Sequence, residues 1–371
     1  MKTAVAIVGG GLAGLHAARL LQAANIHFVL FEARERLGGR ILSVGPDGLA
    51  SDDGFDLGPS WYWPEMQPPL AALVDELGVG SFPQPNEGMA VYERTRGAPP
   101  QRYPGISHEP RSMRFAGGTN ALIKALASGL PSERIRTSHR IVAASLENDE
   151  VTLKVISEDG FNEARFDHVI FALPPRLLQS VVTFQPEMDQ AMSARWRSAA
   201  TWMAPHAKFF AIYDKAFWRE AGLSGTAQSM VGPLAEVHDA STATGAAALF
   251  GFVGIAADDR GRIGEEVLKK ACVEQLGRLF GGEALRPRAV LLKDWSTDPA
   301  TATADDRLGG AHPHPDRKPW VSGDWIGRVS LAGSETSPVN PGYLAGAVEA
   351  AEIAVEHIIR NLTKRKETIA C

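Results

Sequence analysis

The chain has little cysteine and no long apolar run. Its only cysteines, Cys272 and Cys371, lie far apart in sequence, so no disulfide framework is expected and a reducing compartment is indicated. No stretch of 18 uninterrupted apolar residues occurs, and the C-terminal segment through Lys366 is too short and too polar to span a bilayer. We therefore expect a cytoplasmic protein without membrane insertion.

A strong charge of either sign is missing as well. Lysine and arginine together number 38 against 43 acidic residues, a net charge of −5. This balance leaves no large basic field to attract nucleic acid or an anionic membrane. With 44% hydrophobic and 22% charged residues the composition is that of a folded globular protein, and 371 residues favour two interlocked domains.

A βαβ unit with a glycine turn opens the chain. The hydrophobic pattern predicts a strand at Ala4–Val8, a helix at Leu12–Ala24 and a second strand at Ile26–Phe31. Further along, the segment Pro83–Pro110 is rich in proline and glycine and predicts loops between domains. Short strands predicted at 141–146, 151–157 and 166–171 suggest a small β-meander. Later segments predict strands at 208–213 and 247–255, a helix at 264–280, a strand at 329–332, a loop at 333–342 and a helix from 343 to about 362.

The turn at residues 9–14 matches the pattern G-x-G-x-x-G between a predicted strand and a predicted helix. Gly9 permits the tight turn, Gly11 lets the backbone approach a pyrophosphate, and Gly14 lets helix and strand pack closely. Glu32 ends the second strand, where a carboxylate can accept hydrogen bonds from ribose hydroxyls. The alternative is a plain glycine turn with a chance acid, and the fingerprint alone does not separate NAD from FAD.

The run from Glu32 to Arg40, EARERLGGR, resembles an extension of the fingerprint in the flavin amine oxidase superfamily. In that superfamily arginine and backbone amides complete the phosphate site, and Arg34 or Arg40 has the planar fork that suits phosphate oxygens. A solvated surface arginine is the alternative for either one. Further blocks resemble the same family along the chain: Asp56–Trp61, Arg114–Gly118, Phe171–Pro175, Ala332–Thr336 and Gly342–Ala347.

The resemblance to flavin monoamine oxidases implies an α/β fold, with a GxGxxG Rossmann-type FAD-binding domain and an interleaved mixed α+β substrate domain. The FAD-binding domain would comprise residues 1–70, 111–197 and 305–371, and the substrate domain residues 71–110 and 198–304. The residues implied to contact FAD are Gly9, Gly11, Leu12, Ala13, Gly14, Glu32, Ala33, Arg34, Gly39, Arg40, Gly58, Pro59, Ser60, Trp61, Ile141, Ala172, Gly333, Ser334, Glu335, Gly342, Tyr343, Leu344 and Ala347.

The C-terminal block, Gly342–Ala347, also predicts a buried helix independently of the family resemblance. Leu344, Ala347, Val348 and Ala351 follow helical spacing, so this helix should be buried, with its positive N-terminal end available to an electron-rich ring. Glu335, just before it, resembles the family acid that hydrogen-bonds the ribityl chain of the flavin. Without the resemblance, such an acid is more often a surface loop residue.

Lys208 shares one face of its predicted strand with Phe210 and Ile212. From the pattern alone it could be an edge-strand lysine that blocks unwanted pairing. The resemblance implies instead that it holds a water against flavin N5. Trp295 resembles a family tryptophan that precedes a double glycine, although the intervening stretch is longer in this chain, and a core aromatic is its alternative.

Tyr343 matches the family position of an aromatic ring that helps to enclose the amine nitrogen. His312 stands in the place of the second enclosing aromatic, with a plain loop residue as the alternative, and Ala311 stands where some members carry a cysteine that tethers flavin. FAD is therefore expected to be non-covalent. His312, His314 and Asp316 could suggest metal ligands, but the intervening prolines predict a rigid loop, and no metal is expected.

We therefore expect an FAD-dependent amine oxidase. Hydride transfer from the carbon alpha to an amine onto flavin N5 would give an imine, then an aldehyde or ketone, while O2 regenerates flavin as H2O2. The partners would be a small-molecule amine and O2. A desaturase or dehydrogenase acting on a carbon–carbon bond and a non-catalytic flavin-binding redox module are the alternatives. The chain is short for this family between Trp61 and Arg114, which implies a more open or shallower substrate site, and oligomeric state is left open.

Overall fold

The computed structural model describes residues 4–105 and 109–370, which divide into two compact units. Unit 1 comprises the chain up to Arg40, then Leu122–Trp202, then the residues from Gly310 onward. Unit 2 comprises Ile41–Ala121 and Met203–Gly309. The chain thus alternates between the units. The functional division into FAD-binding and substrate segments with bounds at 70, 110, 197 and 304 concerns ligand binding and stays a prediction.

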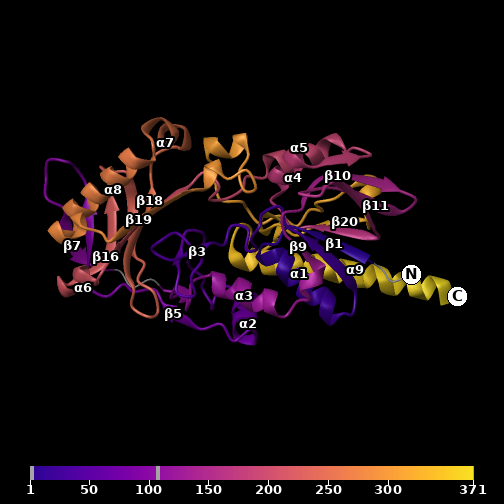
Figure 1. Cartoon of the computed structure of the whole chain (residues 1–371), viewed down its shortest axis with the longest axis horizontal. Helices are drawn as coiled ribbons and strands as arrows, with labels where there is room; N and C mark the ends of the chain where they lie inside the picture. The colour runs from indigo at the N-terminus through magenta and orange to yellow at the C-terminus, as the bar shows by residue number, and fades with distance from the viewer. Residues whose placement is uncertain (1–3, 106–108, 371) are drawn as a thin grey trace. The chain divides into compact units, whose positions relative to one another are not determined.

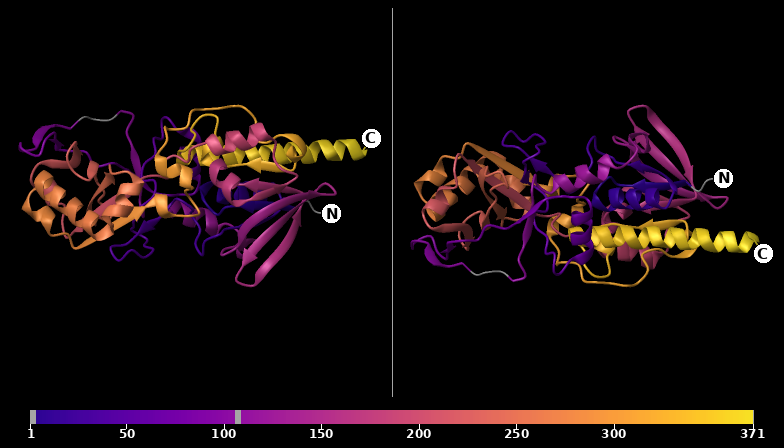
Figure 2. Two further views of the ribbon diagram at one scale, coloured as in Figure 1. Left: turned by 90° about the horizontal axis from the view of Figure 1, so that it is seen from above. Right: turned by 90° about the horizontal axis from the view of Figure 1, so that it is seen from below.

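A parallel sheet forms the centre of unit 1, with strand order β20-β13-β1-β2-β9. Its strands are β1 (Ala4–Val8), β2 (His27–Phe31), β9 (Ile135–Arg136), β13 (His168–Phe171) and β20 (Val329–Leu331). Helix α1 (Leu12–Ala23) connects β1 to β2, and α9 (Leu344–Ala370) packs against α1 (Figures 1 and 2). The βαβ opening and the Rossmann-type fold are confirmed.

A second sheet of unit 1 has the order β12-β11-β10-β14. It contains β10 (Arg140–Glu147), β11 (Glu150–Ser157), β12 (Gly160–Phe166) and β14 (Thr183–Gln185), and Figure 2 shows β10 to β12 as one curved antiparallel layer. The predicted single strand at 166–171 is wrong. Phe166 ends β12 in this sheet, whereas β13 begins at His168 and pairs in parallel with β1 and β20.

The core of unit 1 contains side chains from both of these sheets, among them Phe31, Phe166, Phe171, Phe184 and Trp196. The helices that complete the unit are α3 (Asn120–Ser128, which begins at the end of unit 2), α4 (Pro175–Val181) and α5 (Gln190–Ser198), with 3-10 turns at Ser132–Arg134, Gly323–Trp325 and Ser334–Thr336. The last of these turns lies in the segment predicted as a plain loop. The predicted burial of the last helix is confirmed for Leu344, Ala347, Val348 and Ala351, and one face stays buried as far as Ile358. This helix extends beyond the predicted end near 362.

Unit 2 is built on a mixed sheet in the order β19-β15-β18-β17-β16-β6-β7 (Figure 1). Its strands are β6 (Met89–Glu93), β7 (Gln101–Pro104), β15 (Ala207–Tyr213), β16 (Leu223–Ser229), β17 (Leu234–Asp239), β18 (Ala247–Val253) and β19 (Ala289–Asp294). The prediction that Pro83–Pro110 is loop is therefore wrong over β6 and β7. These strands are short, and β6 is held by pairing with β16, which lies more than a hundred residues away in sequence.

The two faces of this sheet carry different cores. Helix α8 (Glu265–Phe280) covers one face, where Cys272 packs with Phe209 and Tyr213, as its helical position predicted. Phe210 and Ile212 belong to a separate cluster on the opposite face. Smaller elements are α2 (Pro68–Glu76), α6 (Phe217–Glu220), α7 (Ala257–Ile263), the ladder of β3 (Ser43–Val44) with β4 (Phe55–Asp56), the ladder of β5 (Ser81–Pro83) with β8 (Met113–Phe115), and 3-10 turns at Gly282–Leu285, Trp295–Thr297 and Ala304–Leu308.

No helix within residues 4–105 and 109–370 combines the length and the apolar character needed to cross a membrane.

Candidate active site

In the glycine turn of unit 1, Gly14 has no room for a side chain, whereas Gly11 has room for one. A Cβ at Gly14 would overlap the carbonyl oxygen of Gly9, so helix α1 can approach the turn only without a side chain there. At Gly11 an added Cβ would meet protein atoms only at 3.8 Å and beyond, which is ordinary contact. Protein packing therefore requires glycine at position 14 but not at position 11, and the space beside Gly11 fits a ligand phosphate that approaches the backbone.

The N-terminus of α1 faces the same turn. Gly11 is its N-cap and provides no side-chain hydrogen bond, so the first-turn N–H groups, beginning at Leu12 and Ala13, have no side-chain cap. Ala172 lies beside the turn, because its N–H bonds to the Val8 carbonyl at 2.8 Å. These N–H groups and the positive end of the helix dipole suit a pyrophosphate.

Glu32 is buried at the end of β2, with 3% of its surface exposed. Its Oε2 accepts the Gly10 N–H at 2.7 Å and its Oε1 accepts the Arg34 N–H at 2.9 Å, with the Arg34 guanidinium 3.7 Å away. A carboxylate has about four acceptor positions, so acceptor capacity remains for a ribose hydroxyl. The alternative of a chance acid does not account for this burial.

Arg40 links the double-glycine extension to the segment that precedes α9. Its guanidinium donates to both carboxylate oxygens of Glu335, at 2.7 and 3.3 Å, and to the Ser334 hydroxyl at 2.9 Å. The alternative of a surface loop acid at Glu335 is wrong, because its residue exposure is only 3%. Arg40 is likewise more than a solvated arginine, since this forked pairing fixes its orientation. Gly333 is equally constrained, because a Cβ there would overlap the Leu173 carbonyl.

Three aromatic rings of unit 1 form what we call the aromatic cluster: Trp202, His312 and Tyr343. The His312 ring lies 4.3 Å from the Trp202 ring and 4.9 Å from the Tyr343 ring, and Trp202 lies 5.0 Å from Tyr343, all between ring centroids. Gly342 precedes Tyr343 with φ of +81°, and an added Cβ there would meet Trp202 at 3.3 Å. The structure therefore brings His312 next to Tyr343, and its role at a substrate site stays a prediction.

The loop that carries His312 is fixed at its far end by Arg195 of α5. The Arg195 guanidinium pairs with Asp316 at 2.9 Å, stacks 3.8 Å from the centroid of the Trp320 ring and donates to the carbonyls of Lys318 and Pro319. Asp316 therefore serves an ion pair. Within the described ranges, no group of three or more histidine, cysteine, aspartate or glutamate side chains lies close enough together to hold a metal ion.

Lys208 lies in β15 of unit 2, between β18 and β19. The alternative of an edge-strand lysine is therefore wrong. Its Nζ donates to the Asp56 carbonyl at 2.9 Å, to the Gly58 carbonyl at 2.7 Å and to the Ser60 hydroxyl at 2.8 Å. It also lies 4.4 Å from the centroid of the Phe250 ring. An ammonium has three donors, so these three oxygens use all of them.

Burial and the nearby charge of Asp56 shift the pKa of Lys208 in opposite directions. Burial lowers the pKa of Lys208 to about 7, although the negative charge of Asp56 acts in the other direction. Burial also raises the pKa of the Asp56 carboxyl, against the charge of Arg114 and hydrogen bonds from Ser43 and Thr119. Arg114 is itself buried, and its guanidinium donates to the Ser241 carbonyl at 2.8 Å.

The segment from Gly58 to Trp61 is held by unit 2 through both main chain and side chains. The Pro59 carbonyl accepts the Thr119 hydroxyl at 2.7 Å, and the Trp61 ring packs 5.4 Å from Phe250. Trp295 is buried, and its indole N–H donates to the Leu57 carbonyl at 2.9 Å, which agrees with the core alternative and also supports this segment.

The sequence-predicted residues thus fall into local groups. Within unit 1 the structure gathers Gly9, Gly11, Leu12, Ala13, Gly14, Glu32, Ala33, Arg34 and Ala172 around the turn, with Gly39 against Gly11, and Arg40 with Ser334 and Glu335. Leu344 and Ala347 are buried in α9. Ile141 is packed in the unit 1 core, in one cluster with Val8 and Phe31, and its contact with FAD stays a prediction. Within unit 2 Lys208, Gly58 and Ser60 come together. Sequence reasoning missed Trp202, whose only signal is an aromatic residue shortly after α5.

A parallel sheet with a phosphate-type glycine turn and a buried acid after its second strand is the fold of a dinucleotide-binding oxidoreductase. The sequence profile described as NAD(P)-binding Rossmann-like domain matches residues 7–77, and the profile described as Flavin containing amine oxidoreductase matches residues 105–359. The chain belongs to the flavin-containing amine oxidoreductase family and is a flavin-dependent oxidoreductase.

Individual relatives agree with this assignment. The chain is 26% identical to a probable flavin-containing monoamine oxidase A of Dictyostelium discoideum, over 93% of this chain and 95% of the relative. It is 24% identical to an L-amino acid dehydrogenase of Synechocystis sp., over 95% of this chain and 94% of the relative. A solved structure of putrescine oxidase bound to putrescine shares the fold, with a TM-score of 0.78 at 20% identity, covering 97% of this chain and 99% of that one.

Proposed function

We propose that the chain is an FAD-dependent amine oxidase acting on small amines. When bound, the flavin would accept a hydride from the carbon alpha to the amine, giving an imine that hydrolyses to an aldehyde or ketone, and O2 would take the electrons to form H2O2. The residues of the chain would bind and orient the amine, exclude water and hold the cofactor.

The observation that carries this proposal is the aromatic cluster of Trp202, His312 and Tyr343. Its ring centroids lie 4.3 to 5.0 Å apart. An aromatic wall of this kind excludes water and favours an uncharged amine, whose nitrogen lone pair is free to support oxidation at the neighbouring carbon.

Within unit 1, the open side of Gly11, the uncapped start of α1 and the buried Glu32 fit the pyrophosphate and ribose of FAD. We propose that FAD is held without a covalent bond. Ala311 stands where a tethering cysteine would be, and Cys272 is buried in the unit 2 core, where burial raises the pKa of its thiol to about 12. Precipitation with acid should release all flavin into the supernatant, and flavin that stays with the pellet would refute non-covalent binding.

We still propose that Lys208 acts at the flavin. Its proposed role of holding a water molecule requires a free hydrogen-bond donor, however. A water could be held only if one of the three oxygens that now accept its donors were released. Its established contacts fix the main chain from Asp56 to Ser60. Trp295, bonded to the Leu57 carbonyl, would support the same segment rather than touch the substrate.

The identity of the amine stays open between primary amines, polyamines and amino acids. The alignment with the Dictyostelium relative spans 448 positions, more than the 371 residues of this chain, so that relative carries segments with no counterpart here. We propose that the predicted substrate domain is shorter here than in that relative and leaves a more open substrate site.

Two measurements test the proposed function. Hydrogen peroxide release over a panel of primary amines, polyamines and amino acids should identify substrates, and anaerobic titration with those amines should bleach the flavin absorbance. If no amine in the panel bleaches the flavin, the proposal is wrong. Bleaching by an apolar compound without an amine would instead support dehydrogenation of a carbon–carbon bond.

A further inference from the structure

The Nε2 atom of His312 is buried and has no hydrogen-bond partner among the residues that the structure describes. A buried polar atom without a partner costs free energy, so an unused one beside a proposed substrate site calls for a ligand group. The imidazole ring of His312 packs against the rings of Trp202 and Tyr343, with centroids 4.3 and 4.9 Å away. These two rings make apolar contact with the imidazole, and the Nε2 atom is left without a hydrogen bond.

The position of His312 is well determined by its surroundings. Pro313 follows it directly and packs 3.3 Å from where a Cβ of Gly342 would lie, and Arg195 fixes the same loop at Asp316. The two ring contacts and the anchored loop limit the freedom of the imidazole to turn away. An imidazole held in this way keeps its hydrogen-bonding direction constant, which is the condition for selecting a ligand group.

The indole of Trp202 cannot replace this nitrogen as an acceptor, because it is a donor only, whereas the Tyr343 hydroxyl can both donate and accept. Of the three rings, His312 alone has a buried polar atom without a hydrogen-bond partner among the described residues. A neutral imidazole whose proton is on Nδ1 presents Nε2 as an acceptor. A neutral primary or secondary amine has an N–H to donate to it, and that bond leaves the amine lone pair uninvolved.

We propose that His312 Nε2 accepts a hydrogen bond from the N–H of the substrate amine and thereby makes this chain select primary and secondary amines over tertiary ones. This inference rests on the proposed function, because it assigns the amine nitrogen to the aromatic cluster. The selection arises because a tertiary amine in its neutral form has no N–H, and Nε2 then stays unpaired.

The test uses binding of amines that cannot be oxidised. A tert-alkyl amine with a trifluoromethyl group has no hydrogen on the carbon alpha to nitrogen, and its fluorines keep it neutral at pH 8. Its N,N-dimethyl derivative lacks the N–H. Calorimetry on the flavin-loaded protein gives the ratio of the two dissociation constants for the wild type and for each variant.

The wild type should favour the primary amine, and His312→Phe, which keeps a ring of similar size, should reduce that preference by roughly tenfold. Trp202→Phe should leave the preference unchanged, because it alters only the wall. The comparison cancels the extra bulk of the methyl groups, since both variants experience it.

An unchanged preference in His312→Phe, or an equal loss in Trp202→Phe, would overturn the proposal, as would a wild type that binds neither amine. Turnover separates this result from the proposed function. If the expected preference is found but no amine of the panel is oxidised, His312 selects amines while the oxidase assignment fails. If an amine of the panel is oxidised and the preference is absent, only the role of His312 fails.

Discussion

At the scale of single residues, Lys208 shows how a buried cation is balanced. Burial lowers its pKa to about 7, while three oxygen acceptors and the face of Phe250 favour the charged form. An unfolded lysine has a pKa of about 10.4. Between pH 7 and pH 10 the unfolded chain therefore binds more protons at this site than the folded chain does, and stability should rise with pH there.

Replacement of Lys208 by Met should remove this dependence. The free energy of unfolding of the wild type relative to Lys208→Met should increase from pH 7 to pH 10, with a slope of at most about 1.4 kcal/mol per pH unit, and should be constant below pH 7. Urea unfolding from pH 6 to pH 10 measures it. Lys154→Met, at an exposed position, is the control. Parallel curves for wild type and Lys208→Met would show that the folded lysine keeps an ordinary pKa.

The pair of Arg40 and Glu335 allows a second test. Removing Arg40 leaves the Glu335 carboxylate buried without its main partner, so Arg40→Met should lower the free energy of unfolding by about 2 kcal/mol. Glu335→Gln should recover part of that loss when it is added to Arg40→Met. A double-mutant cycle in chemical denaturation measures the coupling, and additive effects would mean that the pair contributes no net stability.

The residues of the site were predictable to different degrees. Gly14 and Glu32 belong to a local pattern with a fixed spacing, so their packing followed from sequence. Trp202 did not, because its neighbours His312 and Tyr343 lie more than a hundred residues further along and only the fold brings them together. The pairing of Arg40 with Glu335 was missed for the same reason, since contacts at that separation leave no local signal.

At the scale of elements, β13 and β12 show which strands hydrophobic periodicity detects. β13, HVIF, is buried at every position and was detected, but its start was placed too early. β12, GFNEARF, is mostly exposed and polar, so no alternation marked it. The assignment of β13 to a meander failed because periodicity gives strand position and not pairing partner, and the partners of β13 are β1 and β20.

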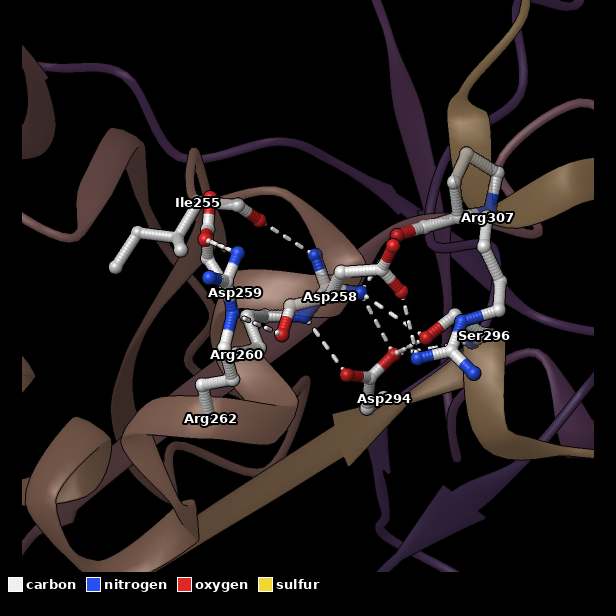
Figure 3. A network of polar contacts seen from close by, with 9 residues as sticks. Ile255, Asp258, Asp259, Arg260, Arg262, Asp294, Ser296 and Arg307 are labelled. Atoms are coloured by element: carbon white, nitrogen blue, oxygen red, sulfur yellow. Dashed lines mark hydrogen bonds and ion pairs between the residues drawn. The ribbon is translucent and has the colours of Figure 1, made fainter.

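Arg260 of α7 joins several elements of unit 2 through polar contacts. Its guanidinium donates to both oxygens of Asp294 at 2.7 Å and to the Ile255 carbonyl at 2.6 Å (Figure 3). It also donates to the Pro205 carbonyl at 2.6 Å. It is only 5% exposed. The planar fork satisfies acceptors at the end of β19, ahead of α7 and ahead of β15 together, which a lysine cannot do.

Arg260→Lys should therefore lower the free energy of unfolding by about 2 to 4 kcal/mol. The matched control is Arg262→Lys on the same helix, whose partner Asp259 is exposed (Figure 3), and its effect should be close to zero. Thermal and urea unfolding of the two variants give the comparison. Equal effects would show that the Arg260 network adds nothing beyond a surface ion pair.

At the scale of the whole molecule, each unit is assembled from separated segments. Unit 1 draws on residues from the beginning, middle and end of the chain, and unit 2 on the two stretches between them. The resemblance to a known family implied an interleaved arrangement of this kind, whereas composition and periodicity predicted only that two domains were present. Sequence patterns report on neighbouring residues. The strand pairings that define these units, such as β13 with β20 and β6 with β16, join residues that are far apart in sequence.

Binding of FAD to unit 1 should therefore stabilise segments from three parts of the chain at once. A ligand at one hundred times its dissociation constant adds about 2.7 kcal/mol to the free energy of unfolding, or roughly 5 to 10 °C to the Tm.

Two substitutions in the glycine turn test whether FAD binds there. Gly11→Ala should leave the Tm of the flavin-free protein nearly unchanged, because protein atoms leave room for its Cβ, but should strongly reduce the shift on adding FAD. Gly14→Ala should lower the flavin-free Tm, because its Cβ would overlap the Gly9 carbonyl. Differential scanning calorimetry with and without FAD separates the two, and a Gly11→Ala protein that keeps the full shift would show that the phosphates do not lie against Gly11.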